Sequence, residues 1–279
     1  KMKLMQKIDK KITSVDHKIE IISSLKIDLI SQIFLCNFNN IKSVIRVDFD
    51  IPNWLKKQRA LEFKILNFLK TKTQNQKILY HNLDRGILIR EFHEGKEISY
   101  FDIIRKEDLI SLGKEIKKVH EIKIDNAAIN NFENTIENYR DILKNKIKKN
   151  WYLNQGFKIF DSLSCKKKQI VFSHNDLNRQ NILLNKKYFF IDWEYASANS
   201  PYFDLASIIS SCDLNDEEIG YLFDGYDKNF LLDQEKLRNW IKFTYFLDYI
   251  WRQCLIETTK HDEKILGIKG LERNLDIFK

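Results

Sequence analysis

The hydrophobic pattern of this 279-residue chain changes its period along the sequence, and this change constrains the fold more than any other feature. In the first third, short apolar or alternating runs rich in Ile, Val and Phe are joined by polar connectors, which is typical of strands in a meander. The predicted strands are 17–25, 31–39, 42–50, 77–82 and 86–92. Between the third and fourth of them, residues 54–72 carry apolar side chains at helical spacing just after Pro52, which predicts a helix.

Beyond residues 93–99 the period becomes helical, with one interruption. The interruption consists of three strand-like runs, at 169–174, 181–185 and 187–193. Helices are predicted at 106–122 and 131–149, and again after Pro201 through to the end of the chain. The pattern predicts an α+β protein with a small β-rich part, a hinge near residues 89–95, and a larger, mainly helical part.

Composition and charge narrow the class of protein. A chain with 43% hydrophobic residues can bury two cores, and its length favours two lobes. No apolar run approaches the roughly 18 residues of a membrane span, and the charged start lacks the apolar core of a secretory signal. We therefore expect a cytoplasmic protein with no membrane span.

The four cysteines and the basic charge indicate no further site. The cysteines lie far apart without paired spacing, which indicates neither a disulfide framework nor a zinc cage. The net charge of +8 is spread along the chain, and the lysine runs are not interleaved with exposed-looking aromatic residues. We therefore expect no nucleic-acid partner.

The stretch VFSHNDLNRQNILLNKKYFFIDWEY, residues 171–195, sets a polar cluster between two apolar runs. Asp176 and Asn181 lie five residues apart in a loop, and Asp192 follows at the end of a strand, so the three can converge at the mouth of one hairpin. Taken singly, an Asp or Asn here is most often a turn former. The combination fits phosphoryl transfer, in which a carboxylate takes the hydroxyl proton while amide and carboxylate oxygens hold Mg²⁺ rather than zinc.

Three motifs together carry a resemblance to a known family. HNDLNRQN at 174–181, FFIDWEY at 189–195 and PYFDLA at 201–206 resemble the catalytic segment of the choline kinase and aminoglycoside phosphotransferase superfamily. The sequences of these motifs are similar to those of bacterial choline kinases that prime lipopolysaccharide decoration. The resemblance implies a bilobal, protein-kinase-like fold, with a nucleotide-binding lobe at 1–92 and a catalytic and substrate-binding lobe at 93–279.

The resemblance also implies roles for individual residues of the catalytic segment. Asp176 would be the catalytic base, and Asn181 and Asp192 would hold Mg²⁺. Asp204 would brace the catalytic loop from the start of a helix, and His174 would support the backbone of that loop. Glu194 is expected to support the site, either near the metal or from the surface.

For ATP, the resemblance implies that Arg46 on the third strand reaches the phosphates, because the arginine fork matches phosphate oxygens. Glu62 on the following helix would pair with Arg46, although the two could equally form a surface ion pair of little worth. Backbone groups of the hinge, chiefly Glu91 and Phe92, would meet the adenine ring.

One departure from the family pattern concerns the phosphate loop. Kinases of this superfamily usually carry a glycine between the first two strands, where a backbone must approach phosphates closely, whereas the first glycine of this chain is Gly86. The segment 24–32 would have to act with side chains in place, through Ser31 or Gln32. A pseudokinase that binds nucleotide without transferring phosphate is the alternative.

The acceptor implied by the resemblance is choline, or ethanolamine. A quaternary ammonium suits aromatic faces and a nearby carboxylate. The candidate substrate-binding residues are Trp251, Asp213, Asp248 and Tyr195. Aromatic residues at helical spacing are also typical of a core, and Asp248 can instead pair with Arg252. An aminoglycoside, thiamine or a sugar is the alternative acceptor.

Overall fold

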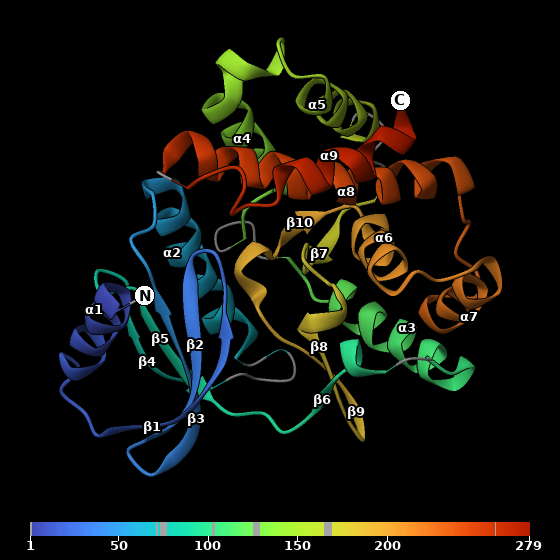
Figure 1. Ribbon diagram of the computed structural model, residues 1–279. Helices are drawn as coiled ribbons and strands as arrows, with labels where there is room; N and C mark the ends of the chain where they lie inside the picture. The colour runs from blue at the N-terminus through green and yellow to red at the C-terminus, as the bar shows by residue number, and fades with distance from the viewer. Residues whose placement is uncertain are drawn as a thin grey trace. The chain divides into compact units, whose positions relative to one another are not determined.

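The computed structural model describes residues 2–70, 72, 77–101, 104–124, 129–164, 169–259 and 261–279. It divides into two compact units, Lys1–Glu94 and Gly95–Lys279 (Figure 1).

The first unit is built on one antiparallel sheet in the order β1-β2-β3-β5-β4. All five strands lie where the sequence predicts them. They are β1 (Ile19–Ile27), β2 (Ser31–Phe38), β3 (Ile41–Asp48), β4 (Ile78–Asn82) and β5 (Ile87–Glu91). The predicted helix is α2 (Asn53–Leu69). A further helix, α1 (Met2–Thr13), was not predicted.

The core of this unit explains why α1 forms. Ile8 and Ile12 lie one helical turn apart on α1 and are buried against alternate residues of the sheet, such as Phe34 on β2 and Ile45 on β3. Because side chains of a strand alternate between its faces, Arg46 points away from this core. On that opposite side it meets Glu62 of α2.

The second unit is mainly helical. Its long helices are α3 (Lys106–His120), α4 (Phe132–Ile147), α5 (Trp151–Ser164), α6 (Pro201–Cys212), α7 (Asp216–Tyr226), α8 (Gln234–Thr258) and α9 (Ile268–Leu275). In Figure 1, α4 and α5 lie above α8 and α6 lies below it. Trp240, Phe243 and Phe246 on α8 are fully buried, so aromatic residues at helical spacing here form the core.

Short strands of the second unit carry the catalytic segment. The antiparallel hairpin β8 (Ile182–Asn185) and β9 (Lys187–Phe190) pairs with β6 (Lys96–Glu97), and β7 (Val171–Ser173) pairs with β10 (Ser197–Asn199). The predicted interruption in the helical region is therefore confirmed, whereas α5 and β10 were not predicted. In the described part of the chain, no helix is both long and apolar enough to cross a membrane.

Helices α3 and α7 cross in direct backbone contact through two glycines. A Cβ atom at Gly113 would overlap the carbonyl oxygen of Leu222, and one at Gly225 would overlap the carbonyl oxygen of Ile110. No side chain fits at either point. The crossing therefore fixes α3, and with it His120 at the end of that helix, against α7.

Gly225→Ala is expected to lower the free energy of unfolding by about 2 kcal/mol, because the helices must separate to admit the methyl group. Gly220→Ala is the matched control on the same helix, since a Cβ there meets nothing within 4 Å. That control should raise stability by up to about 1 kcal/mol through helix propensity. Urea unfolding monitored by circular dichroism measures both, and equal effects of the two substitutions would contradict the close crossing.

Candidate active site

The loop between β7 and β8 is held by a buried carboxylate. Asp204, in the first turn of α6, accepts the backbone N–H of His174 at Oδ2 (2.7 Å) and that of Asn175 at Oδ1 (2.8 Å). Asp204 is fully buried. Pro201 at the start of α6 fixes where the helix begins and so where this carboxylate lies.

A third donor reaches Asp204 from α3. The ring of His120 contacts Asp204 Oδ2 through Nε2 (3.1 Å) and the hydroxyl of Tyr226 through Nδ1 (2.9 Å). Burial alone would raise the pKa of Asp204, but the hydrogen bond from His120 and the backbone donors outweigh it, so the pKa lies below its usual value. The carboxylate is therefore ionised as it holds the loop.

The side chain of His174 ties the loop to the strand that precedes Asp192. Its Nε2 donates to the carbonyl of Ile191 (2.9 Å), and its Nδ1 accepts the N–H of Asp176 (3.3 Å). One nitrogen donates and the other accepts, which is the neutral imidazole. Burial lowers the pKa of His174, in agreement with a neutral, structural ring.

Asn175 adopts a left-handed backbone conformation with φ of 62°. Its carboxamide donates to Ser197 Oγ (2.7 Å) and to the carbonyl of Tyr195 (3.0 Å), and it accepts from Asn199 (2.8 Å). Asn is one of the residue types that tolerate this conformation. Asn175 was not predicted to have a role, yet its side chain joins the loop to β10 and to the turn after Asp192.

Two amides orient the carboxylate of Asp176. Asn178 Nδ2 donates to Oδ1 (3.0 Å) and Asn181 Nδ2 donates to Oδ2 (2.8 Å). The same Asn181 nitrogen also reaches the Asp176 carbonyl (2.8 Å), which closes the loop on itself. Asp176 is thus held as an ionised acceptor at a half-buried position.

Asn181 and Asp192 are brought together by the backbone. The N–H of Ile191 donates to the carbonyl of Asn181 (2.9 Å), and Asp192 follows at once with φ of 68°. Because the nitrogen of the Asn181 amide faces Asp176, its Oδ1 is turned away from that carboxylate. One amide oxygen and one carboxylate are a donor set that suits Mg²⁺, which keeps several waters and substrate oxygens.

The described residues form no metal site that consists of protein ligands alone. Within the described ranges, no three His, Cys, Asp or Glu side chains gather closely enough to hold a metal. The residues present therefore fit Mg²⁺ that arrives with phosphates, and they do not form a closed zinc site.

In the first unit, Arg46 and Glu62 form a buried ion pair. Arg46 donates to both oxygens of Glu62, from Nη1 at 2.9 Å and from Nη2. Glu62 is 1% exposed and Arg46 8%. The alternative of a surface ion pair is therefore wrong. Asp48 and Arg59, which the sequence pattern did not indicate, join the pair.

The predicted adenine and phosphate-loop residues also lie in the first unit. The backbone N–H of Glu91 donates to the carbonyl of Lys77, and the backbone N–H of Phe92 donates to the carbonyl of Lys42. Both N–H groups are therefore already used in backbone hydrogen bonds. Ser31 and Gln32 are buried in β2, and Gln32 Nε2 donates to Ser24 Oγ on β1 (3.1 Å). The Gln32 side chain thus joins β2 to β1, and Ser31 is buried at the start of β2.

Of the candidate residues for binding the acceptor substrate, Tyr195 lies beside the catalytic loop and Asp213 lies at the end of α6. Tyr195 lies in the short helix η3 (Trp193–Tyr195) directly after Asp192, and its carbonyl accepts from Asn175. Glu194 precedes it and is buried. Asp213 ends α6 in a left-handed conformation, with φ of 53°. The pKa of Tyr245 on α8 is raised, first by burial and then by the Asp213 carboxylate, which places Asp213 near that helix.

Asp248 and Trp251 both lie on α8. Asp248 accepts from Arg252 at both oxygens, from Nε at 2.9 Å and from Nη2 at 3.2 Å, which is the pairing named above as the alternative to substrate binding. Arg252 also donates to the carbonyl of Leu266 (2.9 Å). Trp251 is half-buried. Asp248 therefore has a structural partner, whereas Asp213 is exposed.

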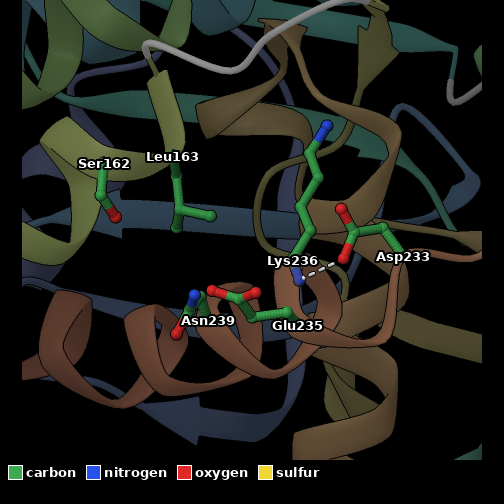
Figure 2. Close-up of a pocket in the computed structure, with 6 residues that line it drawn as sticks. All are labelled: Ser162, Leu163, Asp233, Glu235, Lys236 and Asn239. Carbon is green, nitrogen blue, oxygen red and sulfur yellow. Dashed lines mark hydrogen bonds between the residues drawn. The ribbon is translucent and has the colours of Figure 1, made fainter.

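A cavity elsewhere in the second unit is too small to hold choline. It measures about 30 Å³, room for a water or two, and Figure 2 shows the residues around it. The dashed line there marks the Asp233 side chain capping α8 through the N–H of Lys236 (2.9 Å). The lining residues are Ser162, Leu163, Asp233, Glu235, Lys236 and Asn239.

A five-stranded antiparallel sheet with a buried Arg–Glu pair between strand and helix, followed by a helical unit with a braced H-x-D loop, defines a protein-kinase-like phosphotransferase fold. The sequence profile of the choline/ethanolamine kinase family matches residues 19–253. The chain belongs to this family of small-molecule kinases.

Individual relatives agree with the family assignment. Protein LicA of Haemophilus influenzae is 46% identical over 54 residues, which are 19% of this chain and 20% of the relative, so the match spans about a fifth of that protein. A structure of LicA in complex with AMP superposes with a TM-score of 0.72 at 17% identity and covers 100% of both chains.

The choline kinase LicA from Streptococcus pneumoniae has a TM-score of 0.69 at 16% identity, with 99% of this chain and 98% of that chain covered. At such low identity, these two structures show the fold alone. The predicted α+β, protein-kinase-like fold class is confirmed.

Proposed function

We propose that this chain transfers the γ-phosphoryl group of ATP to the hydroxyl of choline. The observation that carries the proposal is the catalytic loop, in which Asp204 holds the backbone while two amides orient the Asp176 carboxylate. The family membership over residues 19–253 and the AMP-bound LicA relative support nucleotide as the donor.

In the proposed mechanism, Asp176 accepts the proton of the attacking hydroxyl. The oxygen of the acceptor then attacks the γ-phosphorus, the bond to the β–γ bridging oxygen breaks, and ADP leaves. The amides of Asn178 and Asn181 keep the Asp176 carboxylate in one orientation during this transfer. Mg²⁺, held by Asn181 and Asp192, would supply charge that offsets the phosphates.

The first unit would bind the nucleotide. Arg46, fixed by Glu62, presents a guanidinium that suits phosphate oxygens. Since the N–H groups of Glu91 and Phe92 are used in the sheet, these two residues would contact adenine through their carbonyl oxygens, which can accept from its amino group.

We infer that Asp213, rather than Asp248, attracts the cationic group of the acceptor substrate. A carboxylate paired with a guanidinium attracts a cation less than one without such a neighbour. Asp248 carries Arg252 on both oxygens, while Asp213 is exposed near Tyr245. Trp251 and Tyr195 would provide aromatic faces for the trimethylammonium group, while Glu194 supports the turn. Because the motifs at 174–206 resemble those of bacterial choline kinases that prime lipopolysaccharide decoration, we place the reaction in the cytoplasm, upstream of a lipopolysaccharide modification.

An acceptor panel tests the proposal. Purified protein with ATP and Mg²⁺ should release ADP when choline is added, and more slowly with ethanolamine, and addition of EDTA should stop it. Turnover only with an aminoglycoside, thiamine or a sugar would overturn choline but keep the kinase. Nucleotide binding without turnover on any acceptor would favour the pseudokinase.

A further inference from the structure

A network of four buried charges lies inside the unit Lys1–Glu94, of which the proposed chemistry uses only Arg46 and Glu62. Arg59 contacts both carboxylates of this network. Its Nε and Nη2 reach Asp48 at 3.2 Å each, and its Nη1 lies 3.7 Å from Glu62 Oε2. Asp48 in turn lies 3.5 Å from Arg46 Nε. The result is a closed ring of alternating charges.

The sequence spacing brings these residues together. Asp48 follows Arg46 by two positions on β3, so both side chains lie on the same face of the strand. Arg59 precedes Glu62 by three positions on α2, so these two also share a face. Each of the two elements therefore contributes one positive and one negative group.

All four charged side chains are buried, so a change in their net charge is poorly screened by water. The exposed fractions are 8% for Arg46, 3% for Asp48, 4% for Arg59 and 1% for Glu62. Two guanidinium groups face two carboxylates, so the ring has no net charge. Removing one charge from such a site leaves an uncompensated charge with little water to screen it.

Two other titratable side chains approach the ring. Lys11 donates to the backbone carbonyl of Asp48 (2.6 Å). The imidazole of His81 stacks on the ring of Phe63, with 4.1 Å between the ring centroids. Burial lowers the pKa of His81, so its imidazole is neutral at pH 7. Neither side chain replaces the charge of Arg59.

We propose that Asp48 and Arg59 are positioning residues for nucleotide binding, which hold Arg46 and set the net charge that the phosphates of ATP meet. The inference rests on the proposed use of ATP. Without Arg59, the Arg46 guanidinium faces two carboxylates, and the ring repels phosphate. Without Asp48, the ring carries one net positive charge and attracts phosphate. The two losses should therefore change ATP affinity in opposite directions.

The test measures the dissociation constant of ATP by calorimetry for the full chain and its variants. Arg59→Gln should weaken ATP binding by about tenfold, and Asp48→Asn should tighten it by about tenfold, the size expected for one unit charge in a poorly screened site. The double variant should return to within about twofold of wild type, because the ring is again neutral.

Two controls separate charge from general damage. Adenosine, which has no phosphate, should bind all variants alike. Lys7→Gln removes a positive charge from an exposed pair with Asp50 in the same unit and should leave ATP affinity unchanged within about twofold. The urea midpoint should fall for both single variants and recover in the double variant.

Weaker ATP binding in both single variants would overturn the proposal, because a merely structural role lowers affinity in one direction only. If Arg59→Gln does not fold, Asp48→Asn and the double variant still decide between the two roles. A wild-type chain that binds adenosine but not ATP would overturn this inference together with the proposed function. Turnover of choline by wild type, with both single variants weakened, would overturn this inference alone.

Discussion

Replacing Asp176 with Asn is expected to lower kcat for phosphoryl transfer to choline by about 10³-fold, within the range usual for loss of a general base. The substitution removes the group that accepts the hydroxyl proton and changes little in size. It also sets an amide NH₂ against one of the two amide donors that now hold the carboxylate, Asn178 and Asn181.

The matched control is Asp161→Asn. Asp161 lies on α5 in the same unit and pairs on the surface with Arg140 (2.6 Å). Steady-state kinetics with saturating ATP and choline should show wild-type kcat for this control. A variant at Asp176 that keeps more than about a tenth of the wild-type kcat would contradict its role as the base.

Replacing Asp204 with Ala is expected to lower the free energy of unfolding by about 3–5 kcal/mol, the usual cost of breaking a buried, charge-assisted network. The backbone N–H groups of His174 and Asn175 and the ring of His120 would all lose their acceptor inside the protein. Because the catalytic loop is then no longer held, activity should fall as well. Urea unfolding measures the change, with Asp161→Ala as control.

The effect should depend on pH in a defined direction. Because the pKa of Asp204 is lowered in the folded protein, its contribution is fully present above the unfolded value of about 3.9 and is lost as the pH falls through the folded value. The stability difference between wild type and Asp204→Ala should therefore shrink as the pH falls below about 4. A difference that grows as the pH falls below about 4 would contradict an ionised Asp204.

The sequence predicted those elements of the fold whose hydrophobic period is clear. Strands such as β3 and β5 are short runs rich in Ile and Val, and α2, α3 and α8 repeat at helical spacing. Helix α1 was missed because its buried face consists of few apolar residues among many lysines, and it forms by packing on the sheet. Tertiary contact, which a local pattern does not contain, decides such an element.

In the candidate site, too, the sequence predicted the residues that lie close together along the chain and missed the distant ones. Asp176, Asn181 and Asp192 are close in sequence, and one backbone hydrogen bond between Ile191 and Asn181 brings the two halves together. His120 reaches Asp204 from 84 residues away. A single buried His on an apolar helix face gives no signal of its partner. In the same way, only the three-dimensional arrangement shows that Arg59 and Asp48 belong with Arg46 and Glu62.

The most direct measurement of the central claim follows the phosphoryl group itself. The protein is incubated with Mg²⁺, choline and ATP carrying a γ-³²P label, and the products are separated. The account predicts label in phosphocholine, at a rate that falls about 10³-fold in Asp176→Asn. Label that remains in ATP, or appears only in inorganic phosphate, would contradict it.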